Sequence, residues 1–200
     1  MSSVRALPLR VVDGLELDEK YRKALKPGEI LHDREGRARR LPRFFYEVDS
    51  GKTAAETDIC PHFSVWEFIN TDVREARELH GFPRYIPCAV SLIAAHLELF
   101  RQQVGVVVRI AANGGYRSPS HALTRHASPH NWGTAVNIYQ IGDEYLDDQE
   151  KIERFNAIAL RLLPGVWVRP YGHNIGYADD HMHMDLSYVS VVPRDAAGEQ

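Results

Sequence analysis

The segment from His181 to Asp185 alternates polar and apolar residues, and this alternation is the strongest constraint on the fold. Successive side chains of a β-strand point to opposite faces, so a period of two predicts a strand with two different surroundings. We expect His181, His183 and Asp185 on one face, lining a cleft. Met182 and Met184 are expected on the other face, in the core. For this segment alone, the alternative is an exposed strand edge with its polar residues in solvent.

Two longer segments show the period of an amphipathic helix. Apolar residues recur every three or four positions from about residue 87 to 103, and again after Asp147. This spacing places them on one buried face of a helix. Gly105 is expected to end the first helix, and Pro164-Gly165 the second. The apolar positions are Val90, Ile93, Leu97, Phe100 and Val104 in the first, and Ile152, Phe155, Ala159 and Leu162 in the second.

Shorter runs rich in β-branched residues predict strands around these helices. The runs cover residues 106–110, 135–139 and 166–169, and the alternating segment predicts a last strand over 181–188. Ser64 and Glu67 form a capping-box pattern, which predicts the start of another short helix. Strands and helices do not alternate regularly enough for a parallel doubly wound sheet. We therefore expect an α+β fold with a small antiparallel sheet flanked by helices.

The composition of the chain changes along its length. Residues 1–56 are rich in charge, Pro and Gly, so we expect an extension that wraps the domain and forms no second core. Residues 57–190 carry the periodic segments and are predicted to form the domain, and residues 191–200 a C-terminal tail. The basic run from Arg34 to Arg43 is expected to be a solvated arm, with a docking patch as the alternative.

Composition excludes several classes of protein. A hydrophobic share of 44% suits a soluble globular protein, and a net charge of −3 gives no bulk attraction to nucleic acid or anionic membranes. The chain shows no apolar run of about 20 residues and no secretory signal, so we expect a cytoplasmic location. Cys60 and Cys88 are expected to be reduced structural thiols, with a disulfide between them as the alternative. The sequence carries no signal of oligomeric state.

A second histidine segment precedes the first by about fifty residues. His130 and Asn137 lie seven positions apart, separated by a turn-forming stretch in which Gly133 and Ala135 leave space beside a ligand. Both side chains can then return to one point. Combined with the strand histidines, they predict a zinc site in which three protein groups bind the metal and one position stays open. A histidine held in the fold for structural reasons is the alternative, and His62 and His173 are further candidates for the cleft.

Three motifs in order resemble those of the zinc D,D-peptidase superfamily. They are Gly115-Tyr116-Arg117-Ser118-Pro119, then Ser128-x-His130-x-x-Gly133-x-Ala135-x-Asn137, then Asp180-x-x-His183. This superfamily includes D-alanyl-D-alanine carboxypeptidases, vancomycin-resistance D,D-dipeptidases, phage L-alanyl-D-glutamate endopeptidases and the hedgehog signalling domain. The resemblance covers roughly residues 62 to 188. It implies a D,D-peptidase or hedgehog-like fold, one Zn²⁺ ion, and a small peptide or peptidoglycan fragment as substrate.

The resemblance also implies roles for individual residues. His130 and His183 correspond to metal ligands, and Asn137 stands where the family has a ligand aspartate. Asp180 corresponds to the general base that activates water, and His181 to a group near the developing oxyanion.

Three further residues correspond to positions that meet the substrate or support the site. Arg117 would hold a substrate carboxylate or polarise the scissile carbonyl, since its planar fork suits both tasks. Ser118 and Ser128 would be hydrogen-bond partners of the substrate or of the groups around the metal.

Asn137 leaves three hypotheses open. In the first hypothesis the amide oxygen, a neutral and weaker ligand than a carboxylate, still binds the metal and the enzyme is active. In the second hypothesis another acid replaces it, with Asp185 on the predicted histidine face and Asp179 nearby. In the third, the chain has lost hydrolysis and keeps a peptide-binding or cell-wall-binding cleft, or uses another divalent metal such as Fe(II) or Mn(II).

Overall fold

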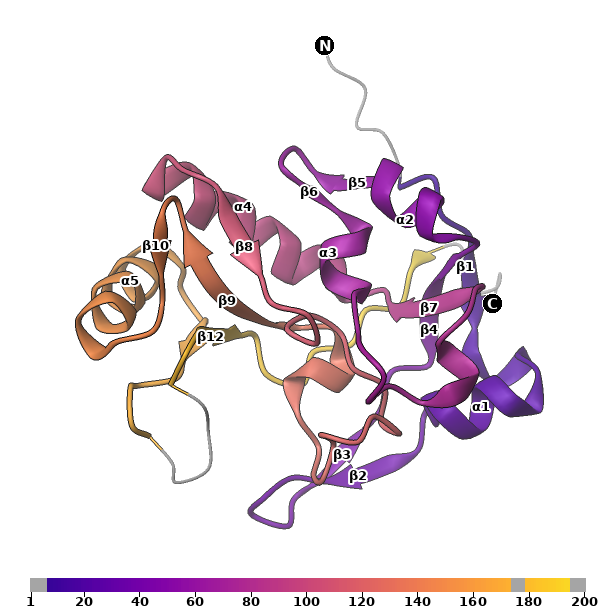
Figure 1. Cartoon of the computed structure of the whole chain (residues 1–200). Helices are drawn as coiled ribbons and strands as arrows, with labels where there is room; N and C mark the ends of the chain where they lie inside the picture. The colour runs from indigo at the N-terminus through magenta and orange to yellow at the C-terminus, as the bar shows by residue number, and fades with distance from the viewer. Residues whose placement is uncertain (1–6, 174–178, 195–200) are drawn as a thin grey trace.

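The computed structural model describes residues 7–173 and 179–194, and its main sheet is antiparallel (Figure 1). Four of its strands follow the order β10-β9-β12-β11, and β8 also pairs with β9, over residues 138–141 of β9. The strands are β8 (Val108–Ile110), β9 (Ala135–Ile141), β10 (Glu144–Tyr145), β11 (Trp167–Val168) and β12 (Met182–Asp185). The chain is thus mixed α/β with small antiparallel sheets, which is compatible with the predicted α+β class.

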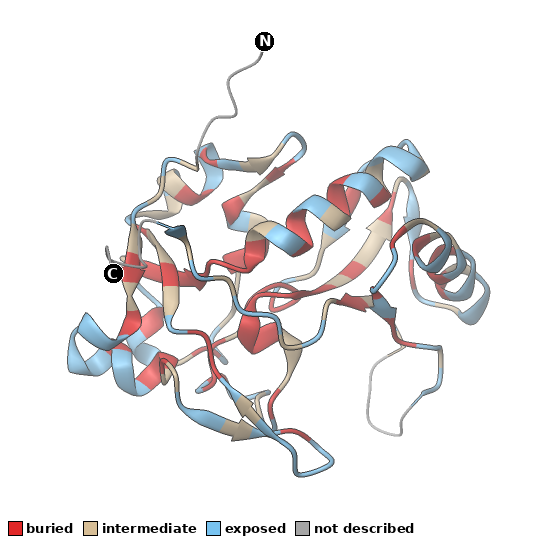
Figure 2. Cartoon of the chain, turned by 180° about the vertical axis from the view of Figure 1, so that it is seen from behind, coloured by how far each residue is buried: buried red, intermediate tan, exposed pale blue. Residues whose placement is uncertain are grey.

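Two helices pack on this sheet where the apolar stripes predicted them. They are α4 (Val90–Val104) and α5 (Gln149–Leu162). Ile93 and Leu97 of α4 are completely buried, and the helix ends at Gly105 with φ 72°, a conformation that glycine adopts easily. Asp148 caps the start of α5 by accepting from the Lys151 backbone N–H. Seen from behind, α4 lies across the sheet with its exposed residues outward (Figure 2).

The alternation in the last strand has the predicted consequence. Met182 and Met184 are fully buried in the main core, and His183 lies on the opposite face. The strand is shorter than residues 181–188, because it begins at Met182 and the chain turns after Asp185, where Ser187 has a positive φ of 63°. The strand expected at 106–110 likewise forms only at 108–110.

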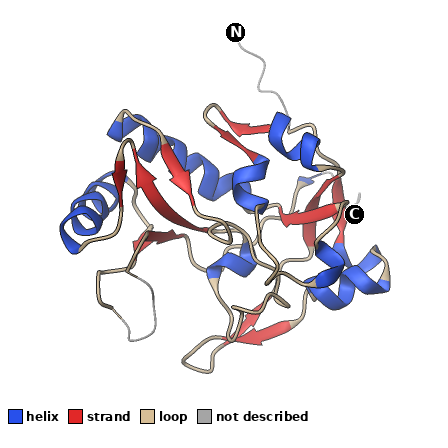
Figure 3. Cartoon of the chain, in the orientation of Figure 1, coloured by secondary structure: helices blue, strands red, loops and turns tan. Residues whose placement is uncertain are grey.

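A second sheet is built largely from the N-terminal segment. Its order is β1-β4-β7, and it lies on the other side of the molecule from the main sheet (Figure 3). These strands are β1 (Val11–Asp13), β4 (Phe44–Val48) and β7 (Arg84–Pro87); the helices near them are α1 (Glu19–Leu25) and α2 (Gly51–Glu56). Phe45 and Val48 belong to the same buried cluster as Ile93 of α4. The described part of residues 1–56 therefore adds a layer to a common core.

Two small hairpins complete the fold. They are β2 (Ile30–His32) with β3 (Ala38–Arg40), and β5 (Asp58–Cys60) with β6 (Phe63–Ser64), which leads into helix α3 (Val65–Ile69). The capping box of Ser64 and Glu67 is present at the start of α3, as predicted. In the basic run, Arg37 and Arg39 form ion pairs with the buried carboxylate of Asp33. Arg37 also pairs with Glu35, so two carboxylates balance these two positive charges within the hairpin.

Two simpler predictions can also be compared with the structure. Cys60 and Cys88 are free thiols, as expected, and are not joined to each other. Within the described residues, no helix has the length and apolar character needed to cross a membrane.

Candidate functional site

The site begins with two side chains on neighbouring strands. His183 of β12 lies directly opposite Asn137 of β9. The backbone N–H of Asn137 donates to Gly114 O and its carbonyl accepts from Ala111 N, both on the side away from β12. The backbones of His183 and Asn137 therefore exchange no hydrogen bonds with each other. In an antiparallel sheet, the side chains of such a pair are the closest of all opposing side chains.

His130 reaches the same point from a short 3₁₀ helix, η3 (Pro129–Trp132), just before β9. Its Nδ1 lies 2.8 Å from Gly115 O, and since a carbonyl only accepts, Nδ1 carries the proton. Gly115 packs so tightly on α3 that a Cβ there would lie 2.3 Å from Phe68 O. The glycine of the first motif is therefore required to bring this carbonyl to the histidine.

The other nitrogen of His130 is left with an unused lone pair. His130 is 1% exposed, and its Nε2 has no hydrogen-bond partner among the described residues. Its ring centroid lies 5.1 Å from that of His183, in an edge-to-face arrangement. Burial lowers the pKa of His130 well below its usual value, and the nearby charge of Arg117 adds to this effect. The ring is consequently neutral near pH 7 and able to act as a ligand.

His183 is held by acceptors on both sides. Its Nε2 lies 2.8 Å from Asp185 Oδ2, and its Nδ1 lies 2.8 Å from Asn137 Oδ1. Burial lowers the pKa of His183 although Asp185 opposes this, so the ring has one proton to share between two acceptors. The carboxylate is the stronger acceptor and takes it. The lone pair of Nδ1 then faces the amide oxygen of Asn137.

These groups fit a divalent metal ion. The two imidazoles and the amide oxygen lie side by side, and a cation among them would satisfy the unpartnered Nε2 of His130 and separate the two facing lone pairs. Tetrahedral ligands about 2.05 Å from zinc lie about 3.3 Å from each other. The 2.8 Å between His183 Nδ1 and Asn137 Oδ1 thus requires a shift of about half an ångström.

The two acids considered as substitute ligands, Asp185 and Asp179, have hydrogen-bond partners of their own. Within the described part of the chain, no group of three His, Cys, Asp or Glu side chains is arranged to hold a metal. Asp185 accepts from His183 Nε2 and from the Ser187 backbone N–H, the role of a carboxylate that orients a ligand imidazole. Asp179 accepts from Gly172 N. Of the candidate third ligands, Asn137 is the one whose oxygen faces the unprotonated nitrogen of His183.

Arg117 lies beside both imidazoles. Its positive charge lowers the pKa of His130 and of His183. Its backbone is fixed on both sides, since its N–H donates to His130 O and its carbonyl accepts from Asn131 Nδ2. The cation predicted from the first motif is therefore positioned by the same short helix that carries His130.

The two predicted serines support the site from within the fold. Ser118 is completely buried and donates its hydroxyl to Glu75 Oε1 at 2.6 Å. Ser128 forms a capping box with Asn131 at the start of η3. These hydroxyls were expected to bond either to the substrate or to groups around the metal. In the structure both serines form hydrogen bonds to protein groups near the site. Glu75, 43 positions earlier in the chain, had no local signal in the sequence.

Asp180 and His181 lie at the rim. The Asp180 side chain is 70% exposed, and its Oδ1 is 2.6 Å from His181 Nδ1. The other nitrogen, His181 Nε2, is 3.3 Å from Arg169 Nη2. Sequence reasoning placed Arg169 only at the end of a strand and missed it as a site residue. A lone arginine that ends an apolar run was the one available signal.

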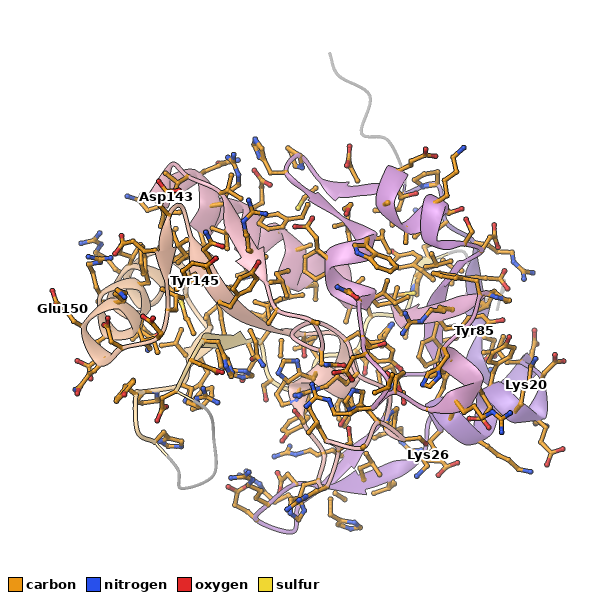
Figure 4. All side chains as sticks on the ribbon, viewed as in Figure 1. Lys20, Lys26, Tyr85, Asp143, Tyr145 and Glu150 are labelled. Atoms are coloured by element: carbon orange, nitrogen blue, oxygen red, sulfur yellow. The ribbon has the colours of Figure 1, made fainter. Side chains whose placement is uncertain are left out.

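An exposed tryptophan forms one wall of the site. Trp167 of β11 is 44% exposed, and its ring contacts those of His183 and His173 at centroid distances of 5.6 and 5.7 Å. His173 thus lies near the site, whereas His62 is paired with Glu98 of α4. Farther along the sheet, the ring of Tyr145 lies 6.2 Å from that of Tyr139 (Figure 4).

Comparison with known proteins adds no assignment. The chain matches no family model, no curated protein and no solved structure. The function is therefore argued from the residues and the geometry of the site.

Proposed function

We propose that this protein is a metal-dependent hydrolase of small peptides or peptidoglycan-type peptides, similar to D,D-carboxypeptidases and D,D-dipeptidases. The observation that carries the proposal is the meeting of two neutral imidazoles with an amide oxygen, one imidazole having a buried nitrogen without a partner. His130, His183 and Asn137 would hold one ion, zinc in the first instance. Bound zinc supplies a Lewis acid and lowers the pKa of a water molecule to about 7.

The remaining residues then have separate tasks. Asp180 accepts the proton of the attacking water, for which its exposed carboxylate is accessible. Arg117 holds the substrate carboxylate or stabilises negative charge that develops on the carbonyl oxygen. Asp185 holds the proton of His183 on Nε2 and so keeps Nδ1 free as a donor to the metal.

One observation favours a second function. If the Asn137 amide is rotated by 180°, its NH₂ group donates to His183 Nδ1 and satisfies that nitrogen without a metal. The cleft would then bind a peptide or a cell-wall fragment without cutting it. The same three groups also suit Mn(II) or Fe(II), which accept nitrogen and oxygen ligands.

Metal content distinguishes these functions directly. The purified protein is equilibrated with zinc, dialysed, and analysed by mass spectrometry of the metal. We expect one equivalent in the wild type and in a control variant, His96→Ala, which removes a half-buried histidine of α4 outside the site. His130→Ala and His183→Ala are expected to lose it. Retention of one equivalent by both of these variants would show that the ion is bound elsewhere.

The replacement of Asn137 provides the second half of the test. Asn137→Asp restores an anionic ligand, and we expect zinc affinity to rise at least about 10-fold, the size of effect that changes near a metal produce. Release of D-alanine from D-alanyl-D-alanine and cleavage of muropeptides are followed by liquid chromatography with mass spectrometry. A wild-type protein that binds muropeptides, holds no metal and cleaves nothing would support the binding function instead.

A further inference from the structure

The backbone of Arg169 is fixed on both sides next to the site. Its N–H donates to His183 O at 3.1 Å, and its carbonyl accepts from Asn156 Nδ2 of α5 at 2.9 Å. Arg169 is only 6% exposed. An arginine whose backbone is held between strand β12 and the buried Asn156 of α5 has a set direction for its side chain, and this direction leads to His181.

The contact between Arg169 and His181 can have only one polarity. A guanidinium carries five N–H donors and no acceptor, and it does not lose its proton in proteins. His181 Nε2, at 3.3 Å from Arg169 Nη2, must therefore be the acceptor. A neutral imidazole with a bare Nε2 has its proton on Nδ1, which is the atom 2.6 Å from Asp180 Oδ1. Both hydrogen bonds then run in one direction: Arg169 donates to His181, and His181 donates to Asp180.

We propose that Arg169 is a positioning residue: by donating to His181 Nε2 it fixes the imidazole with its proton on Nδ1, and the imidazole in turn holds one oxygen of Asp180. This inference rests on the proposed function for its catalytic meaning. It also changes the role of His181, whose Nε2 is occupied as an acceptor and does not donate to an oxyanion. The side chain of Asp180 extends into solvent, so a bond to one oxygen is what keeps the other directed at the attacking water.

The electrostatics agree with this arrangement. A protonated imidazole would turn an N–H toward the guanidinium. The neutral form with one proton is the form that satisfies both neighbours.

The test uses one variant that removes the N–H donor of Arg169 and one that keeps a donor at this position. Arg169→Met has similar length but cannot donate, whereas Arg169→Lys retains a cation and a donor. Arg161→Met, at an exposed position of α5, is the matched control. The ¹⁵N chemical shifts of the His181 ring report which nitrogen carries the proton, and His181→Asn identifies those signals. Zinc content, kcat and KM are measured on the same samples.

In the wild type we expect the shifts of a ring protonated on Nδ1, unchanged in Arg169→Lys and Arg161→Met. In Arg169→Met the two nitrogen shifts are expected to move toward each other, as the proton divides between both nitrogens. The zinc content should stay at one equivalent, while kcat falls about 10- to 100-fold at a nearly constant KM, the usual effect of losing a group that orients another.

A wild-type ring protonated on Nε2, or His181 shifts that do not respond to Arg169→Met, would overturn the proposal. Unchanged kcat in Arg169→Met with altered shifts would also overturn it, because the positioning would then have no consequence. If the wild type cleaves no peptide, the proposed function fails, and the ring shifts still decide the arrangement of Arg169, His181 and Asp180.

Discussion

Trp132 joins the N-terminal hairpin to the helix that carries His130, and its replacement should therefore destabilise the whole chain. The ring is fully buried, its Nε1 donates to Arg40 O at 3.1 Å, and it stacks edge-to-face on Tyr188 at 4.9 Å. Leu41 and Ala127 complete this small cluster. The hydrogen bond from Trp132 to Arg40 spans 92 positions of the chain, so it forms only when the chain is folded.

The cost of Trp132→Phe follows from these contacts. Loss of the indole N–H removes a hydrogen bond worth about 1 kcal/mol. Phenylalanine has three fewer heavy atoms, and at about 0.8 kcal/mol for each buried group of that size the lost burial adds about 2 kcal/mol. We therefore expect the free energy of unfolding to fall by about 3 kcal/mol. Trp66→Phe is the control, because Trp66 is 37% exposed and should cost less than about 1 kcal/mol.

Guanidinium denaturation followed by far-ultraviolet circular dichroism measures both variants. Hydrogen exchange adds a local readout, since the Ala127 N–H donates to His32 O between the hairpin and the site loop. We expect this amide to exchange faster in Trp132→Phe than in the control. A loss below about 0.5 kcal/mol, or one equal to that of Trp66→Phe, would refute the view that this small cluster holds the N-terminal hairpin to the helix that carries His130.

Three further outcomes are expected. Burial raises the pKa of Cys60 and of Cys88 to about 12, so a thiol reagent at pH 8 should label both slowly until denaturant is added; fast labelling of the native protein would contradict this. Burial opposes ionisation of Asp33, but hydrogen bonds from two arginines hold its pKa well below 3.8, so its contribution to stability is present above about pH 4 and is lost as the pH falls further. The Tm of the wild type should accordingly fall more between pH 5 and pH 3 than that of Asp33→Asn, and parallel curves would argue against it. Gly115→Ala places a Cβ against a backbone carbonyl of α3 and should cost several kcal/mol, whereas Gly81→Ala, with open space around it, should change stability by less than about 0.5 kcal/mol in the same denaturation assay.

Patterns among neighbouring residues of the sequence predicted helices α4 and α5 and strand β12. The apolar spacing in α4 and α5 and the alternation of histidine with methionine in β12 are properties of neighbouring residues, so one sequence is sufficient to recognise them. The convergence of His130, Asn137 and His183 was also predicted, and the structure brings them together. Whether they bind a metal remains the proposal tested above.

What the sequence did not predict depends on contacts between distant residues. Glu75 reaches Ser118 across 43 positions, and Trp132 reaches Arg40 across 92. The strands of the N-terminal sheet are three to five residues long, too short to show a clear period. Arg169 is buried by the fold around it, and nothing in its immediate neighbours distinguishes it from an exposed arginine.

Because His183 pairs directly with Asn137, the site forms only when β9 and β12 have the correct register. A slip of one residue between β9 and β12 would turn a methionine toward the cleft and drive the histidine among apolar side chains. Under the proposed function, the ion can therefore bind only chains whose sheet has formed in the native alignment. An ion that binds such chains stabilises them at the expense of misaligned forms, so adding zinc during refolding should raise the yield of correctly paired protein.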